Sequence, residues 1–327
     1  MPRIVFLLLL SGIGFQNQAQ VVHEGYTAKK GVVRVGYGKD DVFPMSEQGY
    51  TLVLPENTAV KGIIISIDDE RPRITDSTRK SFLHQEANAK GMAVLYISTG
   101  VPVDLFFDNS SLLYTDAEIA SVFSTHKLPN KNIFLLGVMT SGHRALKYVE
   151  FCKSGKSKFN PDIKGIVLCE SAIDWVRQWY EGQKQVRDHL TEVGYFEGKM
   201  VSYLFKEKLK ADPVSNMPKM LEFSPYSYFD TKMKKMKWYS GIAMRAYSFA
   251  DIRYWFSTQG KGIYDCNYPD MSGIINEQKL AGNKNAELVV FHSNPEENPG
   301  PNMQKQSSTW EMADKKELVD WMLKFVK

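Results

Sequence analysis

The sequence predicts an α/β fold with a mostly parallel central sheet covered by helices on both faces. Short apolar runs bounded by Gly, Pro and Asn recur along the chain, as buried strands do. Stretches with helical spacing separate these runs, so strands and helices alternate. The chain has 327 residues, of which 43% are hydrophobic and 24% charged, and this is enough for a sizeable core.

The first half of the chain supplies most of the predicted strands. They are Val32–Val35, Tyr50–Leu54, Gly62–Ile67, Met92–Ile97, Ile133–Leu136 and Ile163–Cys169, with helices predicted at about 77–90, 116–126 and 141–152. The run Gly62–Ile67 is continuously apolar, which is typical of a strand buried on both faces. Gly91 follows the first helix at the position where a helix-ending glycine is expected.

Residues of about 172–236 break the alternation and predict a helical insertion. The segment is rich in aromatic residues and methionine, and prolines at 213 and 218 interrupt its helices. The alternating pattern then returns, with strands at Ile242–Tyr247 and Ala286–Phe291 and helices at about 272–280 and 315–326. We expect residues 21–327 to form a single domain that contains this insertion.

The N-terminus predicts a cleaved secretory signal peptide at residues 1–20. Arg3 supplies a positive charge, Ile4–Leu10 an apolar core, and Ala19 a small residue at the cleavage position. A buried N-terminal helix is the alternative. The apolar run is too short for a stable membrane span, so we expect a secreted or periplasmic protein.

Composition excludes several classes of partner. The net charge of +4, from 41 basic and 37 acidic residues, does not favour nucleic acid. The chain has no phosphate-binding, dinucleotide-binding or metal motif, so we expect no cofactor and no metal. The acidic run Asp68–Glu70 is either a cation ligand set or solvated loop charge. Cys152, Cys169 and Cys266 are odd in number, which leaves at least one unpaired and the existence of a disulfide open.

The turn at 137–142 has the layout of a nucleophile elbow, G-x-Ser-x-G, between a strand and a helix. Counting from Gly137, the apex position is Met139, and Ser141 takes the place of the second glycine. A thioether has no proton to remove, so Met139 predicts a vacant nucleophile position.

The order of elements resembles the α/β-hydrolase family over roughly residues 30–327. Antiparallel strands lead, an elbow follows the fifth strand, a helical cap follows the sixth, and two strand–helix pairs finish. The resemblance implies a nucleophile, an acid and a base in that chain order. It implies that Asp251, four residues past Tyr247, is the acid-equivalent residue, although Asp251 is equally a cap of the segment after it. It also implies a histidine shortly before the last helix, where this chain has Ser308.

A serine near the elbow and a histidine near the C-terminus leave Ser–His catalysis as an alternative. Ser141 is either a nucleophile or a helix N-cap, and His292 is either its base or a strand-end residue. His143 is expected to pack beneath the elbow, with a catalytic role as the alternative. The acidic loop at Asp68–Glu70 stands where an oxyanion hole would be, and its carboxylates would repel an oxyanion.

The insertion predicts a cap-covered cleft for a small molecule or a peptide. Candidate lining residues are Thr140, His143, Trp175 and Trp179, and the alternative is that the tryptophans bury the insertion against the sheet. The leading hypothesis is a secreted protein of this fold that has lost Ser–His catalysis and binds a ligand or partner. The alternative is an active esterase or peptidase-like serine hydrolase that uses Ser141, Asp251 and His292.

Overall fold

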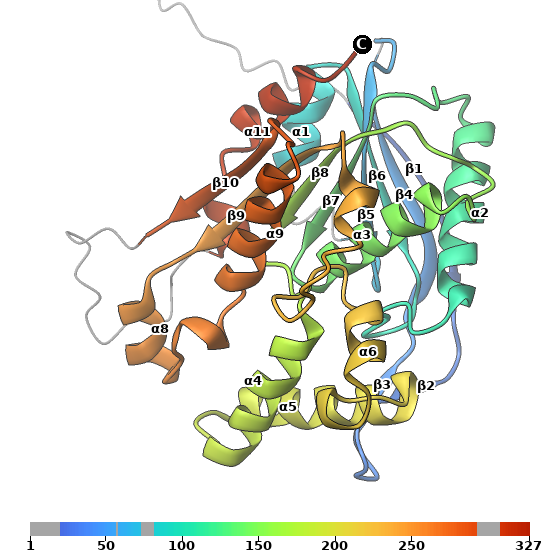
Figure 1. Ribbon diagram of the computed structural model, residues 1–327. Helices are drawn as coiled ribbons and strands as arrows, with labels where there is room; N and C mark the ends of the chain where they lie inside the picture. Colours follow the sequence, from blue (N-terminus) through green and yellow to red (C-terminus); the bar gives the residue numbers. More distant parts are fainter. Residues whose placement is uncertain (1–19, 57, 73–81, 293–307) are drawn as a thin grey trace, which may run out of the picture.

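The computed structural model describes residues 20–56, 58–72, 82–292 and 308–327. Eight strands form the central sheet in the order β1-β4-β6-β5-β7-β8-β9-β10 (Figure 1). Their bounds are β1 (Gln20–Ala28), β4 (Glu47–Pro55), β5 (Gly62–Asp68), β6 (Met92–Ser98), β7 (Ile133–Val138), β8 (Ile163–Cys169), β9 (Ala243–Phe249) and β10 (Ala286–Phe291). The β1–β4 and β4–β6 pairs are antiparallel, and all other neighbours in this sheet are parallel, which confirms the predicted mostly parallel sheet.

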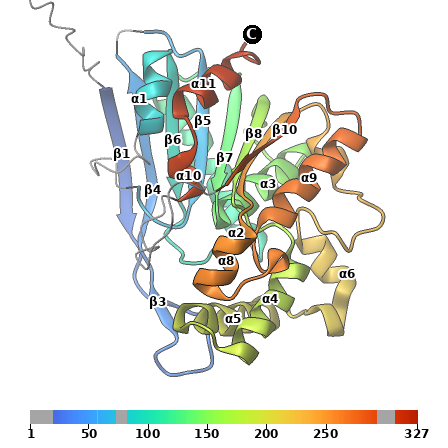
Figure 2. The same cartoon turned by 90° about the vertical axis from the view of Figure 1, so that its left-hand side faces the viewer.

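Helices cover both faces of the sheet. On one face lie α2 (Asn109–Thr125), α3 (Thr140–Lys153) and α9 (Tyr268–Leu280), whose apolar sides share a buried cluster with Ile63, Leu135 and Ile166. On the other lie α1 (Phe82–Ala89), α10 (Thr309–Met312) and α11 (Lys315–Leu323), which pack on Ile64 and Val167 (Figure 2). The central strands β5, β7 and β8 are buried on both sides because their runs are almost entirely apolar.

The chain between β8 and β9 is helical, as the insertion at 172–236 predicts. It forms α4 (Trp175–Asp188), α5 (Glu192–Leu204), the π-helical turn η2 (Phe205–Leu209), α6 (Pro213–Phe223) and α7 (Met236–Tyr239). Figure 1 shows α4, α5 and α6 beyond the end of the sheet. Inside α6, Asn216 is non-helical because two helical segments meet there, and its side chain caps the second segment by accepting from the N–H of Lys219 at 3.2 Å.

Three elements differ from the prediction. Residues 32–34 form β2 (Val32–Arg34), which pairs with β3 (Val42–Pro44) in a separate hairpin, while β1 takes the edge of the central sheet. Helix α2 begins seven residues early because Asp108 caps it, accepting from the backbone N–H of Ser110 at 2.7 Å. The segment after Asp251 is the helix α8 (Ile252–Gln259).

The remaining predictions on chain organisation concern the N-terminal segment, the cysteines and membrane spans. The signal peptide lies outside the described residues except for Gln20, and so does the first part of the helix predicted at 77–90. Cys152, Cys169 and Cys266 are buried free thiols with no disulfide among them. Burial raises the pKa of the Cys152 and Cys266 thiols to about 12. In the described ranges, no helix combines the length and apolarity that a membrane crossing needs.

Candidate functional site

Met139 occupies the apex of the turn between β7 and α3. Its backbone has φ 55° and ψ −123°, an uncommon conformation for a residue other than glycine. Its side chain is 54% exposed, whereas the flanking strand and helix residues are mostly buried. The geometry is that of an elbow, and the group it presents to solvent is a thioether.

Two glycines make this tight turn possible. A Cβ on Gly137 would lie 2.2 Å from the Cα of Gly142, and a Cβ on Gly142 would lie 2.0 Å from Oγ of Ser171. Neither position has room for any other residue. The strand end and the first turn of α3 therefore pack backbone to backbone, which fixes the position of Met139.

Ser141 faces the interior. It is 1% exposed, and its hydroxyl donates to the carbonyl of Val138 at 2.7 Å and accepts from the Val138 N–H at 2.6 Å. The hydroxyl thus closes the turn, as a local serine–backbone bond does. Thr140, the residue between Met139 and Ser141, is partly exposed.

His143 and Trp175 lie in the interior beneath the elbow and bind each other. The indole N–H of Trp175 donates to Nδ1 of His143 at 2.8 Å, and Nε2 of His143 lies 2.8 Å from the carbonyl of Leu105. Nδ1 is therefore the acceptor, and Nε2 carries the proton. Burial, with Lys147 nearby, lowers the pKa of His143 well below its ordinary value. His143 and Trp175 are therefore core residues. Trp179 is partly exposed and packs edge-on to Tyr180.

The acidic loop after β5 meets a buried arginine from α3. Arg144 is 1% exposed and donates to the carbonyls of Ile67 and Asp104, both at 2.9 Å. Its guanidinium lies 3.8 Å from the Asp68 carboxylate and 3.6 Å from that of Asp69. The loop charge is therefore partly balanced by an internal cation. No group of side chains in the described ranges has the arrangement of a metal site.

Of the three residues assigned to the acid and base positions, Asp251 and His292 follow the neighbouring strands β9 and β10, in which Phe249 is level with Phe291, and Ser308 directly precedes α10. Asp251 caps α8, accepting from the N–H of Tyr254 at 3.0 Å. Ser308 caps α10 in a reciprocal pair with Glu311. His292 is exposed and directly follows β10.

The strand register separates His292 from the elbow. Val138 at the end of β7 is level with Cys169, Tyr247 and Val289 across the next three strands. Three strand spacings amount to roughly 14 Å, and His292 lies three residues further along than Val289. That distance is well beyond hydrogen-bond reach of Ser141.

Glu170 is a site residue that the sequence reasoning missed. It directly follows β8 with φ 46°, and its carboxylate accepts from Oγ of Ser248 at 2.9 Å, from the N–H of Phe249, and from Oγ1 of Thr309 at 3.3 Å. Burial raises the pKa of this carboxyl. Thr309 is adjacent to Ser308, so a hydroxyl–carboxylate contact stands where the resemblance implies a histidine. The available signal was a charged residue directly after the apolar strand ending at Cys169.

Comparison with known proteins gives likenesses of structure only. No family model matches the sequence, and no curated protein matches it either. A fungal esterase from Rhizomucor miehei superposes with a TM-score of 0.54 at 10% identity, covering 94% of this chain and 84% of the esterase. An esterase from Pyrobaculum calidifontis gives 0.51 at 13%, covering 94% and 86%. An acylaminoacyl peptidase from Pyrococcus horikoshii gives 0.53 at 13%, covering 86% of this chain and 40% of the peptidase.

These likenesses agree with three features of the chain: the strand order, the elbow after β7 and the helical segment between β8 and β9. The eight-stranded, mostly parallel sheet with helices on both faces is the arrangement predicted from the sequence. This chain therefore has the α/β-hydrolase fold.

Proposed function

We propose that this chain is an exported protein of the α/β-hydrolase fold that lacks Ser–His catalysis and binds a ligand or a partner. The observation that carries the proposal is Met139 at the exposed apex of the elbow, with φ 55° and ψ −123°. Acyl transfer needs a hydroxyl or thiol at this point, activated by an adjacent base. A thioether sulfur has neither the proton nor the nucleophilicity for that step.

The neighbouring hydroxyl does not replace the missing nucleophile. Ser141 is buried, and both its donor and an acceptor site are engaged by the backbone of Val138. To attack a substrate, it would have to break both bonds and reverse the turn that Gly137 and Gly142 hold in place. This arrangement supports a structural role for Ser141.

The six histidines of the sequence offer no base at the elbow. His143 has both ring nitrogens engaged by Leu105 and Trp175, and His292 is separated from β7 by three strand spacings. The other four lie in the contacts His23–His126, in the buried face of α1 at His84, and beside Tyr195 at His189. An unassisted hydroxyl reacts slowly at neutral pH, so this distribution supports the lack of Ser–His catalysis.

The alternative is an active serine hydrolase that uses Ser141, Asp251 and His292. It draws support from the solved structures that resemble this chain, since those named above are esterases and a peptidase. The two proposals differ in whether any serine of the folded protein reacts as a nucleophile.

A fluorophosphonate probe separates the two proposals. Wild-type protein and Ser141→Ala are incubated with the probe beside an active serine esterase, which establishes that the reagent is competent. We expect no labelling of either form and no turnover of p-nitrophenyl acetate above the buffer rate. Labelling of the wild type that disappears in Ser141→Ala would establish the alternative instead.

Binding at the elbow is tested by thermal shift against carboxylic acids, esters and short peptides. A ligand of the elbow should raise the Tm of the wild type but not that of Met139→Trp, which fills the space above the apex. Leu280→Trp is the matched control, because Leu280 is 73% exposed at the end of α9, toward the opposite edge of the sheet. Loss of the shift in both variants, or in neither, would place binding elsewhere.

Export is tested by expressing the full chain and analysing the culture fractions. We expect a processed protein outside the cytoplasm, with an N-terminus near Gln20. An unprocessed chain that begins at Met1 would contradict a cleaved signal peptide.

A further inference from the structure

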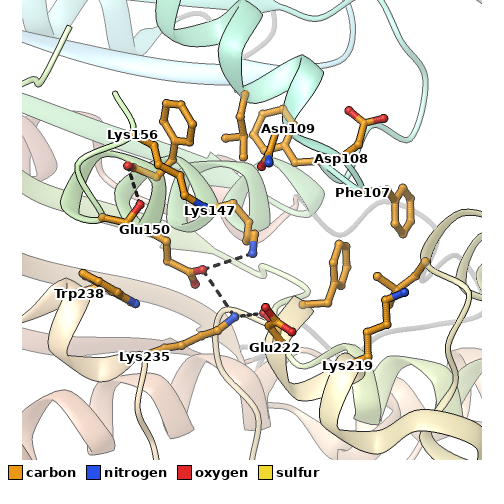
Figure 3. Close-up of a pocket in the computed structure, with 16 residues that line it drawn as sticks. Phe107, Asp108, Asn109, Lys147, Glu150, Lys156, Lys219, Glu222, Lys235 and Trp238 are labelled. Atoms are coloured by element: carbon orange, nitrogen blue, oxygen red, sulfur yellow. Dashed lines mark hydrogen bonds and ion pairs between the residues drawn. The ribbon is translucent and has the colours of Figure 1, made fainter. Parts of the chain in front are cut away.

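A cavity lies along α3, lined by residues of its second half and not by Met139, Thr140 or Ser141 of the elbow. Its volume is about 580 Å³, within the range of small-molecule sites. Residues of α3, α6, α7 and the loop before α2 line it (Figure 3). Glu150, at its centre, is eleven residues beyond Met139 on α3, a separation of roughly 16 Å.

The polar end of the cavity holds two lysines on one carboxylate. Glu150 accepts from the hydroxyl of Tyr239 at 2.8 Å and pairs with Lys147 at 3.3 Å and Lys235 at 3.5 Å. The side chains of Glu150, Lys147 and Lys235 are 13%, 16% and 16% exposed. Two largely buried cations thus share one anion, and a buried excess charge is costly unless a counter-charge joins it.

The two lysines differ in how many of their hydrogen-bond donors are already engaged. Lys235 donates to the backbone carbonyls of Glu222 and Ser224 and points its third proton toward Glu150, so it is saturated. Lys147 has the Glu150 carboxylate as its one hydrogen-bond acceptor in the described part of the chain, and it also lies 5.8 Å from the ring centre of Phe223. Its ammonium keeps donors for an anion in the cavity. Burial lowers the pKa of Lys235 to about 8, in keeping with an uncompensated positive site.

The remaining walls are mainly aromatic. Phe107 stacks on Phe223 with ring centres 5.1 Å apart and planes 7° from parallel, and Phe151 and Trp238 line the cavity as well. Lysines outnumber acids by one among the lining side chains, which are Lys147, Lys156, Lys219, Lys235, Asp108, Glu150 and Glu222. Aromatic surface beside a cation fits a flat ring that carries a negative group.

We propose that this cavity binds an aromatic carboxylate, with its ring against Phe107, Phe151 and Trp238 and its carboxylate on the ammonium of Lys147. The site does not depend on the chemistry at the elbow, because none of Met139, Thr140 and Ser141 lines the cavity. Binding supplies the second anion that the Lys147–Glu150–Lys235 group lacks.

The test compares 2-naphthoate with its neutral analogue 2-naphthamide by isothermal titration calorimetry on the full folded protein. We expect one site that prefers naphthoate by about tenfold or more, the size of a charged hydrogen bond. Lys147→Met keeps the apolar stem and should remove that preference while leaving naphthamide binding unchanged. Lys147→Arg should retain most of it.

Lys153→Met is the matched control, since Lys153 is an exposed lysine of α3 outside the cavity. Glu150 stays paired with Lys235 and Tyr239 in Lys147→Met, so that variant should fold, and its far-UV circular dichroism checks this. Equal affinity for the two probes, no binding of either, or an unchanged preference in Lys147→Met would overturn the proposal. Competition by inorganic phosphate as strong as that by naphthoate would contradict its aromatic part.

Discussion

The indole N–H of Trp175 donates to Nδ1 of His143 at 2.8 Å, directly beneath the elbow. With Nε2 placed against the carbonyl of Leu105, the imidazole is held neutral in one tautomer, and it is fully buried. The residue expected either to pack or to react is therefore a core residue that joins α3 to α4.

His143 makes stability fall as the pH falls. Its pKa is lowered in the folded state, so below about pH 6.5 the unfolded chain binds a proton that the native protein does not. This costs about 1.4 kcal/mol per pH unit until the folded-state pKa is reached. We expect urea denaturation to show a steeper loss between about pH 6.5 and about pH 5.5 for the wild type than for His143→Gln. Equal slopes would contradict a neutral buried imidazole.

Removing the Trp175 donor tests the same contact without changing the histidine. Trp175→Phe should lower the free energy of unfolding by about 1–3 kcal/mol, because it leaves buried Nδ1 without its donor. Trp179→Phe is the comparison, since Trp179 is partly exposed and its N–H has no acceptor among the described residues. Trp179→Phe should lower the free energy of unfolding by less than Trp175→Phe does. If the two variants were equally stable, the Trp175–His143 bond would carry no net stability.

Gly137 tolerates no side chain. A Cβ there would lie 2.2 Å from the Cα of Gly142, so Gly137→Ala must push α3 off β7. We expect a loss of about 3 kcal/mol or more in the free energy of unfolding. Gly262→Ala, where the nearest atom to the new Cβ is 3.6 Å away, should change it by no more than about 0.5 kcal/mol. A neutral Gly137→Ala would mean that the turn is not close-packed.

Arg144 holds the acidic loop to the sheet. Arg144→Met leaves the carbonyls of Ile67 and Asp104 without their donor and removes the cation beside Asp68 and Asp69. The expected cost is about 3–5 kcal/mol, measured by chemical denaturation. Arg187→Met removes an exposed ion pair with Asp188 and should leave the free energy of unfolding nearly unchanged. Similar costs for the two variants would argue against a buried role for Arg144.

Glu170 should destabilise the fold as the pH rises. Its folded-state pKa is raised by burial, so the native protein holds the proton more tightly than the unfolded chain. Stability from this group is present below the ordinary glutamate pKa of about 4.3 and is lost as the pH rises through the folded value. Glu170→Gln removes that ionisation and should gain stability relative to the wild type as the pH rises above about 4. Glu197→Gln, at an exposed position of α5, is the matched control substitution.

The strands of the parallel sheet and the turn at the elbow could be predicted from the sequence because both depend on local patterns. The run Gly62–Ile67 has no polar face, and the small residues from Gly137 to Gly142 permit only a tight connection. The substitution that argues against hydrolysis, Met139 at the apex, was also readable, because the elbow spacing identifies its position by counting.

Only the tertiary structure decided which residues meet across the sheet. The edge position of β1, the separate β2–β3 hairpin and the interior contact of His143 with Trp175 depend on pairing and burial between distant segments. The same holds for Glu170 beside Thr309 and for Lys147 and Lys235 on Glu150. Periodicity predicts which face of an element is apolar. It does not predict which other apolar face that face packs against. The sequence alone thus determined the fold class and the identity of the residue at the apex of the elbow, and the packing of α3 against the sheet decided what surrounds it.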